Sequence, residues 1–549
     1  MINGRLLRDA FISASNNIAN NRQAVDELNV FPVPDGDTGT NMSMTISAAA
    51  RELERIGDDA EVGEVAKVAA SALLRGARGN SGVILSLLFR GFSTGLRDKV
   101  EANGADLANA LTLGVAAAYK AVMKPTEGTI LTVSRVAGEE AAKKATETDD
   151  VIEVWQTIIN AAIDALEKTP EQLPVLKKAG VVDAGGKGLV VILEGMMSVF
   201  KDNVIIKNEN ASASAPVVKA TTAVADSDEE IKFGYCTEYI VDRDKKIDRD
   251  PIKLRAYLES IGDCVVVVDD ESIIKVHVHT NDPGNAIQEG LKFGSLINIK
   301  VDNMRHQHKS TVIEAEKVAE APITPVKPER KYGFVAVGAG DGVCQLFTEL
   351  GVDKIVRGGQ TMNPSTDDIL HAVEATPARH VFILPNNKNI IMAAEQVAPL
   401  SSRKVHVLHT KTIPQGFTAL LNFDETVDSK TNHMAMMKAA EQVSTGLVTF
   451  AARNSHYDGQ SIKKNQILGI ENGKVALVEE DVVKAAYKVA KHLYKKGTHS
   501  VITIIYGNGM TQQQADNVQE LLSAKLGGDV DITVVEGGQP VYYFIISVE

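Results

Sequence analysis

Two carboxylates lie close together in a short loop near the start of the chain. Asp35 and Asp37 flank Gly36 in the run P-D-G-D-T-G-T-N-M at residues 34–42, and Asn29 adds a third oxygen-bearing side chain before it. Glycine lets the backbone turn sharply, so both carboxylates can face one side. Neighbouring carboxylates repel each other unless a cation or a proton separates them. Oxygen ligands suit Mg²⁺, whereas zinc or iron would be expected beside nitrogen or sulfur. The loop therefore predicts a Mg²⁺ site.

The residues after this loop have the apolar spacing of a helix. We expect a helix from about Thr40 onward, with Met42, Met44, Ile46 and Ala49 on its buried side. The free N–H groups of its first turn and the positive end of its dipole would lie beside the loop, so metal and phosphate would share one site. An ordinary turn that caps a helix is the alternative, since Asp-Gly is a common turn dipeptide and Asp or Thr a common cap.

Length and composition indicate a globular protein of several domains. The 549 residues are enough for about three or four domains. A formal net charge of −13 argues against nucleic acid or an anionic membrane surface as a partner. We expect neither a signal peptide nor a transmembrane helix, because no apolar run is long enough. The three cysteines lie far apart and are odd in number, so we expect no disulfide framework and a cytoplasmic location.

Changes in residue pattern set the expected domain boundaries. Residues 1–205 predict an all-helical domain, because apolar residues recur at helical spacing. Residues 206–230 predict a flexible linker, since small and polar side chains cannot bury enough surface to pack. Residues 231–315 alternate strand-like and helical stretches and predict a small α+β domain. Residues 316–330 contain three prolines and predict a stiffer linker.

The remaining residues, 331–549, predict an α/β domain. Helical segments separate the expected strands, which are residues 332–337, 380–384, 404–408, 500–506 and 530–535. In such sheets binding groups collect on loops beyond the strand ends. Loops rich in Gly, Pro and Asn occur at residues 338–342, 358–366, 384–389, 413–416 and 536–540. Each loop alone is equally consistent with simple turn chemistry. Together they predict a recognition surface.

Three further segments place glycine beside residues that can hold phosphate. They are G-A-R-G-N-S-G at 76–82, E-G-T-I at 127–130 and V-D-A-G-G-K-G at 182–188. The first segment opens a helix, so its N–H groups and the Ser81 hydroxyl can bind phosphate. None has the Walker A pattern, and each alone is weak support. Arg78 and Lys187 are candidates to bring positive charge to a transferring phosphoryl group.

Taken in order, the loop and these segments resemble the dihydroxyacetone kinase L-subunit (Dak2) superfamily. The run N-V-F-P-V-P-D-G-D-T-G-T-N-M at 29–42 is more similar to the catalytic subunit of bacterial fatty acid kinase. This resemblance implies a helical barrel that binds ATP and two Mg²⁺ ions, with Asn29, Asp35 and Asp37 as ligands and the two aspartates as catalytic residues. In the sugar-kinase branch the first ligand is an Asp, so Asn29 points away from sugars. The nucleotide contacts that the resemblance implies are Thr38, Gly39, Thr40, Asn41, Asn80, Ser81 and Gly128.

Cys236, His277 and His279 form a second candidate metal site. The two histidines lie two residues apart in an expected strand, so their side chains project on the same side. A thiolate from a neighbouring strand would complete a set suited to Zn²⁺. A free core cysteine with two half-exposed histidines is the alternative that the spacing leaves open. The same residues recur in the middle domain of the fatty acid kinase subunit, where they look like a zinc site, so the resemblance favours Zn²⁺.

The C-terminal region also resembles that subunit, which is related to DegV-like lipid-binding proteins, so the resemblance covers essentially the whole chain. It implies an ATP-dependent kinase that phosphorylates the carboxylate of a fatty acid, presented by a separate DegV-like fatty-acid-binding protein, to give acyl phosphate for phospholipid synthesis. It also implies a homodimer. One alternative is a dihydroxyacetone-type small-molecule kinase. Another is a non-catalytic lipid-binding or regulatory scaffold, which leaves Asp35 and Asp37 unexplained.

Overall fold

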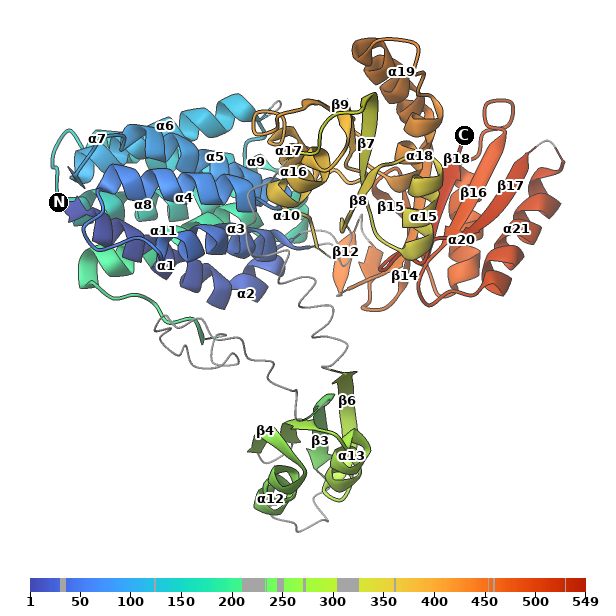
Figure 1. The fold of residues 1–549 in the computed structure, drawn as a ribbon, viewed down its shortest axis with the longest axis horizontal. Helices are drawn as coiled ribbons and strands as arrows, with labels where there is room; N and C mark the ends of the chain where they lie inside the picture. Colours follow the sequence, from blue (N-terminus) through green and yellow to red (C-terminus); the bar gives the residue numbers. More distant parts are fainter. Residues whose placement is uncertain are drawn as a thin grey trace. The chain divides into compact units, whose positions relative to one another are not determined.

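The computed structural model falls into two compact units. It describes residues 1–29, 36–122, 125–209, 233, 235–243, 251–269, 273–303, 325–359, 362–452, 454–457, 460–528 and 530–549. One unit joins residues 1–215 to residues 325–549, and the other is residues 216–324. Figure 1 shows the N-terminal helices of the first unit in blue to teal, its C-terminal helices and sheets in yellow to red, and the second unit in green. Asp35 and most of both expected linkers lie outside the described residues, and the domain boundaries remain a prediction.

The N-terminal helices pack in a closed ring. Each helix contacts the next in the order α1, α3, α4, α5, α6, α7, α8, α11, and α11 contacts α1. The bounds are α1 (Gly4–Asn20), α2 (Arg22–Asp26), α3 (Thr38–Leu53), α4 (Val62–Gly76), α5 (Gly79–Gly95), α6 (Gly104–Ala121), α7 (Ile130–Lys144), α8 (Val151–Glu167), α9 (Thr169–Gln172), α10 (Pro174–Ala179) and α11 (Ala184–Asp202). Two short strands, β1 (Ile2–Asn3) and β2 (Glu101–Ala102), pair beside the ring. The expected all-helical fold is confirmed.

Aromatic side chains run through the core of the ring. Phe11, Phe89, Phe92, Trp155 and Phe200 are all buried. Successive ring centroids along this series lie 5.0, 5.8, 6.4 and 5.1 Å apart, in tilted or edge-to-face contact. Such geometry is favourable beyond the burial of apolar area. The core is therefore a continuous packed structure that fixes where the helix ends lie.

Helix α3 is the helix expected after the loop that carries Asp35 and Asp37, called the metal loop below. It differs from the expectation in two ways. It begins at Thr38, two residues before the expected start. Met42, Ile46 and Ala49 are buried as expected, but Met44 is only half-buried. Two residues correspond to about 200° around a helix, so Met44 lies on the side opposite Met42. The expectation for Met44 was wrong because it ignored this rotation.

The described residues of the middle unit form a four-stranded antiparallel sheet with two helices. The strand order is β4-β5-β3-β6. The bounds are β3 (Tyr235–Arg243), α12 (Pro251–Ile261), β4 (Gly262–Asp269), β5 (Ile273–Thr280), α13 (Pro283–Gly290) and β6 (Gly294–Asn303). Alternate residues Ile274, Val276 and Val278 of β5 are buried in one core with Leu254 and Leu258 of α12. The expected small α+β fold is confirmed, while β6 was not anticipated.

The C-terminal part contains two larger sheets. The first has the order β10-β9-β7-β8, with all strands parallel, and the second has the mixed order β15-β14-β11-β18-β16-β17. The strands are β7 (Arg330–Gly338), β8 (Lys354–Arg357), β9 (Ala378–Leu384), β10 (Lys404–Val407), β11 (Ser444–Phe450), β14 (Ile467–Glu471), β15 (Lys474–Glu479), β16 (Val501–Tyr506), β17 (Asp531–Glu536) and β18 (Phe544–Val548). A separate hairpin joins β12 (Ser455–Tyr457) to β13 (Gln460–Ile462).

Helices and a shared core join these two sheets. The helices are α15 (Asp341–Glu349), α16 (Thr366–Glu374), α17 (Ile391–Glu395), α18 (Ile413–Leu421), α19 (Ser429–Gln442), α20 (Val482–Leu493) and α21 (Gln512–Leu526). Phe334 and Phe382 of the parallel sheet are buried in one cluster with Ile505 and Ile545 of the mixed sheet. The expected α/β class is confirmed, although the sequence did not indicate that the strands form two sheets.

Two of the five loops that the sequence singled out lie against the helical ring. Residues 358–366 follow β8 and residues 384–389 begin at the end of β9, at the carboxyl ends of parallel strands. The Thr366 N–H donates to the Ala77 carbonyl at 3.1 Å, and Ser365 forms an isolated β-bridge with Arg78. Helix α17 also contacts α5. These two loops therefore contact the helical ring of the same chain. Residues of both also line a C-terminal cavity together with Ile413 and Gln415 of the 413–416 loop, and a recognition surface built from all five loops stays a prediction.

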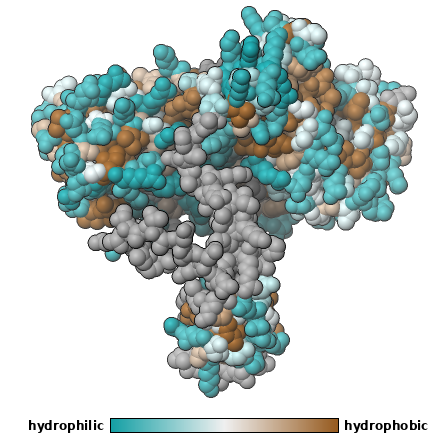
Figure 2. All heavy atoms as spheres, viewed as in Figure 1, coloured by the Kyte–Doolittle hydropathy of each residue, from teal (hydrophilic) through white to brown (hydrophobic). Residues whose placement is uncertain are grey.

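The face of the molecule drawn in Figure 2 is largely hydrophilic. On the face shown in Figure 2, teal hydrophilic residues cover most of the coloured surface and brown hydrophobic ones form smaller patches. Within the described residues, no helix combines the length and the apolar character needed to span a membrane.

Candidate nucleotide and metal site

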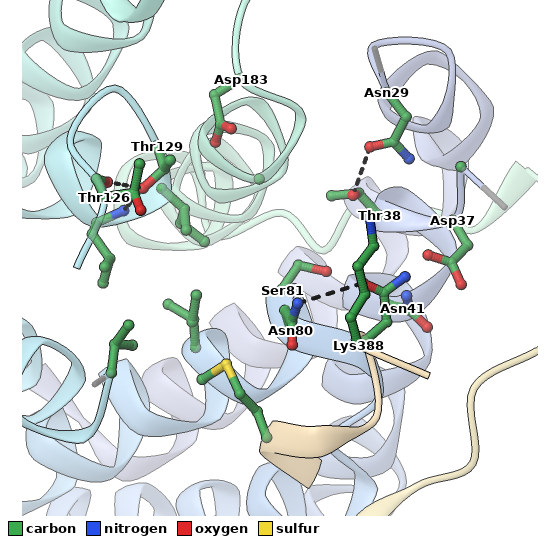
Figure 3. Close-up of a pocket in the computed structure, with 18 of the residues that line it drawn as sticks. Asn29, Asp37, Thr38, Asn41, Asn80, Ser81, Thr126, Thr129, Asp183 and Lys388 are labelled. Atoms are coloured by element: carbon green, nitrogen blue, oxygen red, sulfur yellow. Dashed lines mark hydrogen bonds between the residues drawn. The ribbon is translucent and has the colours of Figure 1, made fainter. Parts of the chain in front are cut away.

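One cavity opens at the end of the helical ring where alternate helices begin. Its volume is about 530 Å³, and its walls include residues from the first turns of α3, α5, α7 and α11. The free N–H groups and positive dipole ends of these helices therefore lie around one space. Figure 3 shows side chains from these helices pointing into the cavity from opposite sides. Such an arrangement favours an anion with several phosphate groups.

Asp37 lies at the rim of this cavity as the N-cap residue of α3. Its side chain makes no cap hydrogen bond, and it is half-buried. Instead its Oδ2 atom accepts a hydrogen bond from the Asn363 side-chain amide at 2.7 Å. Asp37 is thus held by a residue from the C-terminal part, with its carboxylate on the wall of the cavity. It keeps the oxygen chemistry that Mg²⁺ requires.

Asn29 also lines the cavity and connects it to the start of α3. Its side-chain amide contacts the Thr38 hydroxyl at 2.9 Å. With the amide oxygen toward the backbone, that oxygen accepts from the N–H groups of Asp37 at 2.9 Å and Thr38 at 3.2 Å, while the amide nitrogen donates to the Thr38 hydroxyl. This orientation satisfies both amide atoms, so Asn29 fixes the turn that precedes α3. An Asp at this position has no such donor.

Gly39 and Thr40, two of the expected nucleotide contacts, face away from the cavity walls. Asp26 accepts from the Thr40 N–H at 3.1 Å and from the Thr40 hydroxyl at 2.8 Å. A Cβ on Gly39 would lie 2.3 Å from the Arg22 carbonyl oxygen. The structure therefore places these two residues where α2 packs against α3. They support the loop from behind.

Asn41, Asn80 and Ser81 line the cavity, as Thr38 does. Between them Gly79 opens α5 with a φ of +59°, and a Cβ there would lie 2.5 Å from the Asn41 amide nitrogen. Glycine is therefore needed for both the turn and the close approach. Within the described residues, the buried Oδ1 atom of Asn80 has no hydrogen-bond partner. A buried acceptor without a donor is a position where a bound ligand can complete the hydrogen bonding.

The E-G-T-I segment forms a fixed turn below the opposite wall. Glu127 accepts from the Thr132 hydroxyl at 2.6 Å and pairs with Arg135 at 3.1 Å, and the Thr132 hydrogen bond holds the pKa of Glu127 below its usual range. The Gly128 N–H donates to Thr132 Oγ1 at 2.8 Å, and its φ is +81°. Gly128 shapes the turn without lining the cavity, whereas Thr129 is on the wall.

Asp183 caps α11 on the same wall. Its Oδ2 accepts from the Gly186 N–H at 2.7 Å, and its own N–H donates to Thr169 Oγ1 at 3.1 Å. Burial raises the pKa of Asp183 to about 6, although hydrogen bonds from Gly186, Ile130 and Gly185 act in the opposite direction. Desolvation disfavours the charged carboxylate more than these donors favour it. The cavity therefore holds a carboxylate that titrates close to neutral pH.

Arg78 and Lys187 do not reach the cavity. The Arg78 guanidinium donates to the Asn363 carbonyl at 2.8 Å and pairs with Asp368 at 3.4 Å. Neither Arg78 nor Lys187 is among the described residues that line the walls. Arg78 instead joins the helical ring to the C-terminal part. A role for Arg78 or Lys187 in phosphoryl transfer stays a prediction.

The cation that reaches the cavity comes from the C-terminal part. Lys388 and Asn389 line it, and Asn389 Oδ1 accepts from the Asn80 amide at 3.4 Å. Figure 3 shows the Lys388 side chain extending from the C-terminal segment toward Thr38 and Asn41. Of the described wall residues, Lys388 alone is a lysine or an arginine. The sequence singled out its loop as a recognition loop, but no local signal places it near the N-terminal metal loop.

The middle unit brings the backbones of the second candidate set together. Strand β5 pairs with β3 so that Cys236 lies opposite His279 and Glu238 opposite His277. His279 is half-buried. The side chains of Cys236 and His277 lie outside the described residues, so a Zn²⁺ site remains a prediction. Asp35 also lies outside them, and its role as a ligand remains a prediction too.

Comparison with known proteins identifies the family. Models of three regions match: the DAK2 domain at residues 32–198, the FakA-like middle domain of fatty acid kinase at 232–311 and the FakA-like C-terminal region of fatty acid kinase at 333–549. Protein YloV of Bacillus subtilis is 41% identical over 554 residues, which cover all of this chain and 99% of that protein. The chain belongs to the FakA-like fatty acid kinase family.

Solved structures resemble separate parts of this family member. A DegV family protein from Corynebacterium glutamicum is 12% identical with a TM-score of 0.31, over 40% of this chain and 96% of that one. The dihydroxyacetone kinase from C. freundii in complex with AMP-PNP and Mg²⁺ is 19% identical with a TM-score of 0.28, over 35% of this chain and 33% of that one. The three matching domain models indicate a kinase related to fatty acid kinase.

Proposed function

We propose that this chain is a kinase that uses ATP and Mg²⁺ to phosphorylate the carboxylate of a fatty acid, presented by a separate DegV-like fatty-acid-binding protein. The observation that carries the proposal is the cavity where Asp37 meets the first turns of four helices. A volume of about 530 Å³ is in the usual range for a small-molecule site. The family is that of one subunit of a fatty acid kinase, which fits an enzyme that works with another component.

The cavity residues fit a metal–nucleotide complex. Asp37 would hold Mg²⁺ together with the predicted ligand Asp35. The predicted ligand Asn29 would join them only with its amide oxygen turned away from the Asp37 and Thr38 N–H groups. Thr38, Asn41, Asn80 and Ser81 are the predicted nucleotide contacts that line the walls. The unpaired Asn80 acceptor and the helix N-termini supply complementary sites for a polar, anionic ligand. Bound Mg²⁺ would neutralise phosphate charge during transfer.

The proposed reaction needs no general base. An oxygen of the fatty acid carboxylate would form a bond to the γ-phosphorus, the bond from that phosphorus to the bridging oxygen would break, and ADP would leave with the electron pair. The product is an acyl phosphate, for use in phospholipid synthesis. Carboxylates are already ionised at neutral pH, so no proton has to be removed from the acceptor.

The proposal also includes Zn²⁺ in the middle domain, a homodimer and a cytoplasmic location.

The experiment measures ADP formation by the full chain with ATP and Mg²⁺. Three acceptors are compared: fatty acid loaded on a DegV-like fatty-acid-binding protein, dihydroxyacetone, and none. Turnover only with the loaded protein supports the proposal, and turnover with dihydroxyacetone alone overturns it. Asp37→Asn should lower turnover by at least about 100-fold, because a metal ligand loses its charge. Asp150→Asn is the control, since Asp150 is an exposed cap of α8. Full activity of the Asp37 variant would contradict the metal assignment.

A further inference from the structure

The loop that carries Lys388 is held firmly by its own asparagines. The Asn386 amide donates to the Val337 carbonyl of β7 at 2.9 Å, and Thr410 both donates to Asn386 Oδ1 at 2.9 Å and accepts from its N–H at 3.1 Å. Asn386 is 5% exposed and has a φ of +55°, a conformation that Asn tolerates better than most residues. Asn387 in turn donates to the Gly359 carbonyl. The backbone before Lys388 is therefore fixed to the parallel sheet.

Contacts at the start of α3 hold the helical ring against the C-terminal part. The Asn363 amide reaches both Asp37 at 2.7 Å and Asn41 at 3.5 Å, and Asn363 is 3% exposed. The Asn363 carbonyl accepts from Arg78, whose guanidinium also pairs with Asp368. Hydrogen bonds to charged groups are stronger than neutral ones. These contacts set the position of the Lys388 loop relative to the metal loop.

We propose that Lys388 is a catalytic residue of the phosphoryl transfer, and that its ammonium group neutralises the γ-phosphoryl group as the transfer proceeds. This inference rests on the proposed function. Lys388 extends toward the start of α3, where the predicted metal ligands and nucleotide contacts lie (Figure 3). A lysine acts as a compact positive charge, which suits phosphate oxygens. Phosphoryl transfer depends mainly on positioning and on charge neutralisation, so a fixed cation at this point contributes to the rate.

The proposal means that the nucleotide site is built from both ends of the chain. The metal loop lies near the N-terminus, whereas Lys388 follows β9 in the C-terminal α/β part. Lys388 also lines a second cavity, of about 600 Å³, that lies within the C-terminal part. Lys411 lines the second cavity but is absent from the described walls of the first. Lys411 therefore offers a matched control for the loss of one lysine charge.

The test compares Lys388→Met, Lys388→Arg and Lys411→Met in the full chain. Turnover is measured at saturating ATP and over a range of concentrations of the loaded fatty-acid-binding protein. Lys388→Met should lower kcat by about 100-fold or more, which is typical for loss of one electrostatic group in an active site. The kcat of Lys388→Arg should be at least about tenfold higher than that of Lys388→Met, because arginine restores the positive charge with a different geometry. Lys411→Met should retain kcat.

Binding of ATP and ADP gives a readout that needs no acceptor. Compared with the native chain, Lys388→Met should have a Kd for ATP about tenfold higher and a Kd for ADP within about twofold. The reason is that only ATP carries the γ-phosphate. Unchanged kcat in Lys388→Met would overturn the inference. So would a change confined to the KM for the loaded protein, because the lysine would then serve docking. If the native chain forms no ADP with any acceptor, the proposed function fails; an unchanged ATP to ADP Kd ratio in Lys388→Met rejects the lysine assignment separately.

Discussion

Replacing Asp183 with asparagine should stabilise the helical ring at neutral pH. Burial raises the pKa of Asp183 to about 6 from an ordinary 3.8. In the folded chain the proton is therefore held more tightly than in the unfolded chain, so stability falls as pH rises from 3.8 to about 6. Above that pH range, the ionised Asp183 carboxylate lowers the free energy of unfolding by about 3 kcal/mol. Asn keeps the cap on Gly186, and the raised pKa already includes the favourable effect of the N–H donors at the helix start. The expected net gain is therefore about 3 kcal/mol.

The single tryptophan makes this gain measurable for the ring alone. Trp155 lies in α8, is 1% exposed, and donates from its ring nitrogen to the Leu193 carbonyl of α11, the helix that Asp183 caps. Denaturant unfolding followed by its fluorescence should show the gain of Asp183→Asn near pH 7.5 and less than about 1 kcal/mol near pH 4. Asp150→Asn exchanges an exposed N-cap of α8 and serves as the control. An equal gain at both pH values, or the same gain in the control, would refute the reasoning.

Two further substitutions test contacts around the cavity. Asn363→Ala should raise the Mg²⁺ concentration for half-maximal turnover by about tenfold, because Asp37 loses a charge-assisted hydrogen bond; an unchanged Mg²⁺ dependence, or the same shift in the exposed Asn422→Ala, would count against it. Gly79→Ala and Gly180→Ala both place a side chain at positive φ, but the new Cβ meets Asn41 at 2.5 Å in the first case and open space in the second. Gly79→Ala should therefore lower the free energy of unfolding of the ring by about 1–3 kcal/mol more than Gly180→Ala. Tryptophan fluorescence follows the unfolding, and an equal decrease in both variants would show that the close approach to Asn41 is unimportant.

Local pattern was enough to predict the elements with strong repeats. The helical ring and strands such as β9 and β16 follow from apolar periodicity within a few residues of their observed bounds. Strands such as β8 and β18 were missed, because short buried strands differ little from apolar helix segments. The division into two sheets also escaped prediction, since β18 pairs with β11 and β16 across long stretches of sequence.

In the candidate site, too, the sequence predicted the residues that belong to local motifs and missed the residue that comes from a distant part of the chain. Thr38, Asn41, Asn80 and Ser81 belong to segments with recognisable order, and all four line the cavity. Gly39, Thr40 and Gly128 belong to the same motifs, but they are not among the described residues that line the cavity. Lys388 could not be found, because its place in the cavity depends on how two distant parts of the chain pack. The N-N-K-N run by itself indicates only a turn.

The hydrogen bond between Asn363 and Asp37 joins residues 326 positions apart. During synthesis the ribosome releases the metal loop long before Asn363 and Lys388 exist, so the early helical ring lacks one wall of its nucleotide cavity. We expect a nascent chain, or a fragment cut between the two regions, to hydrolyse ATP poorly. On the proposed function, ATP turnover should therefore begin only after the C-terminal part has been synthesised and has packed against the ring.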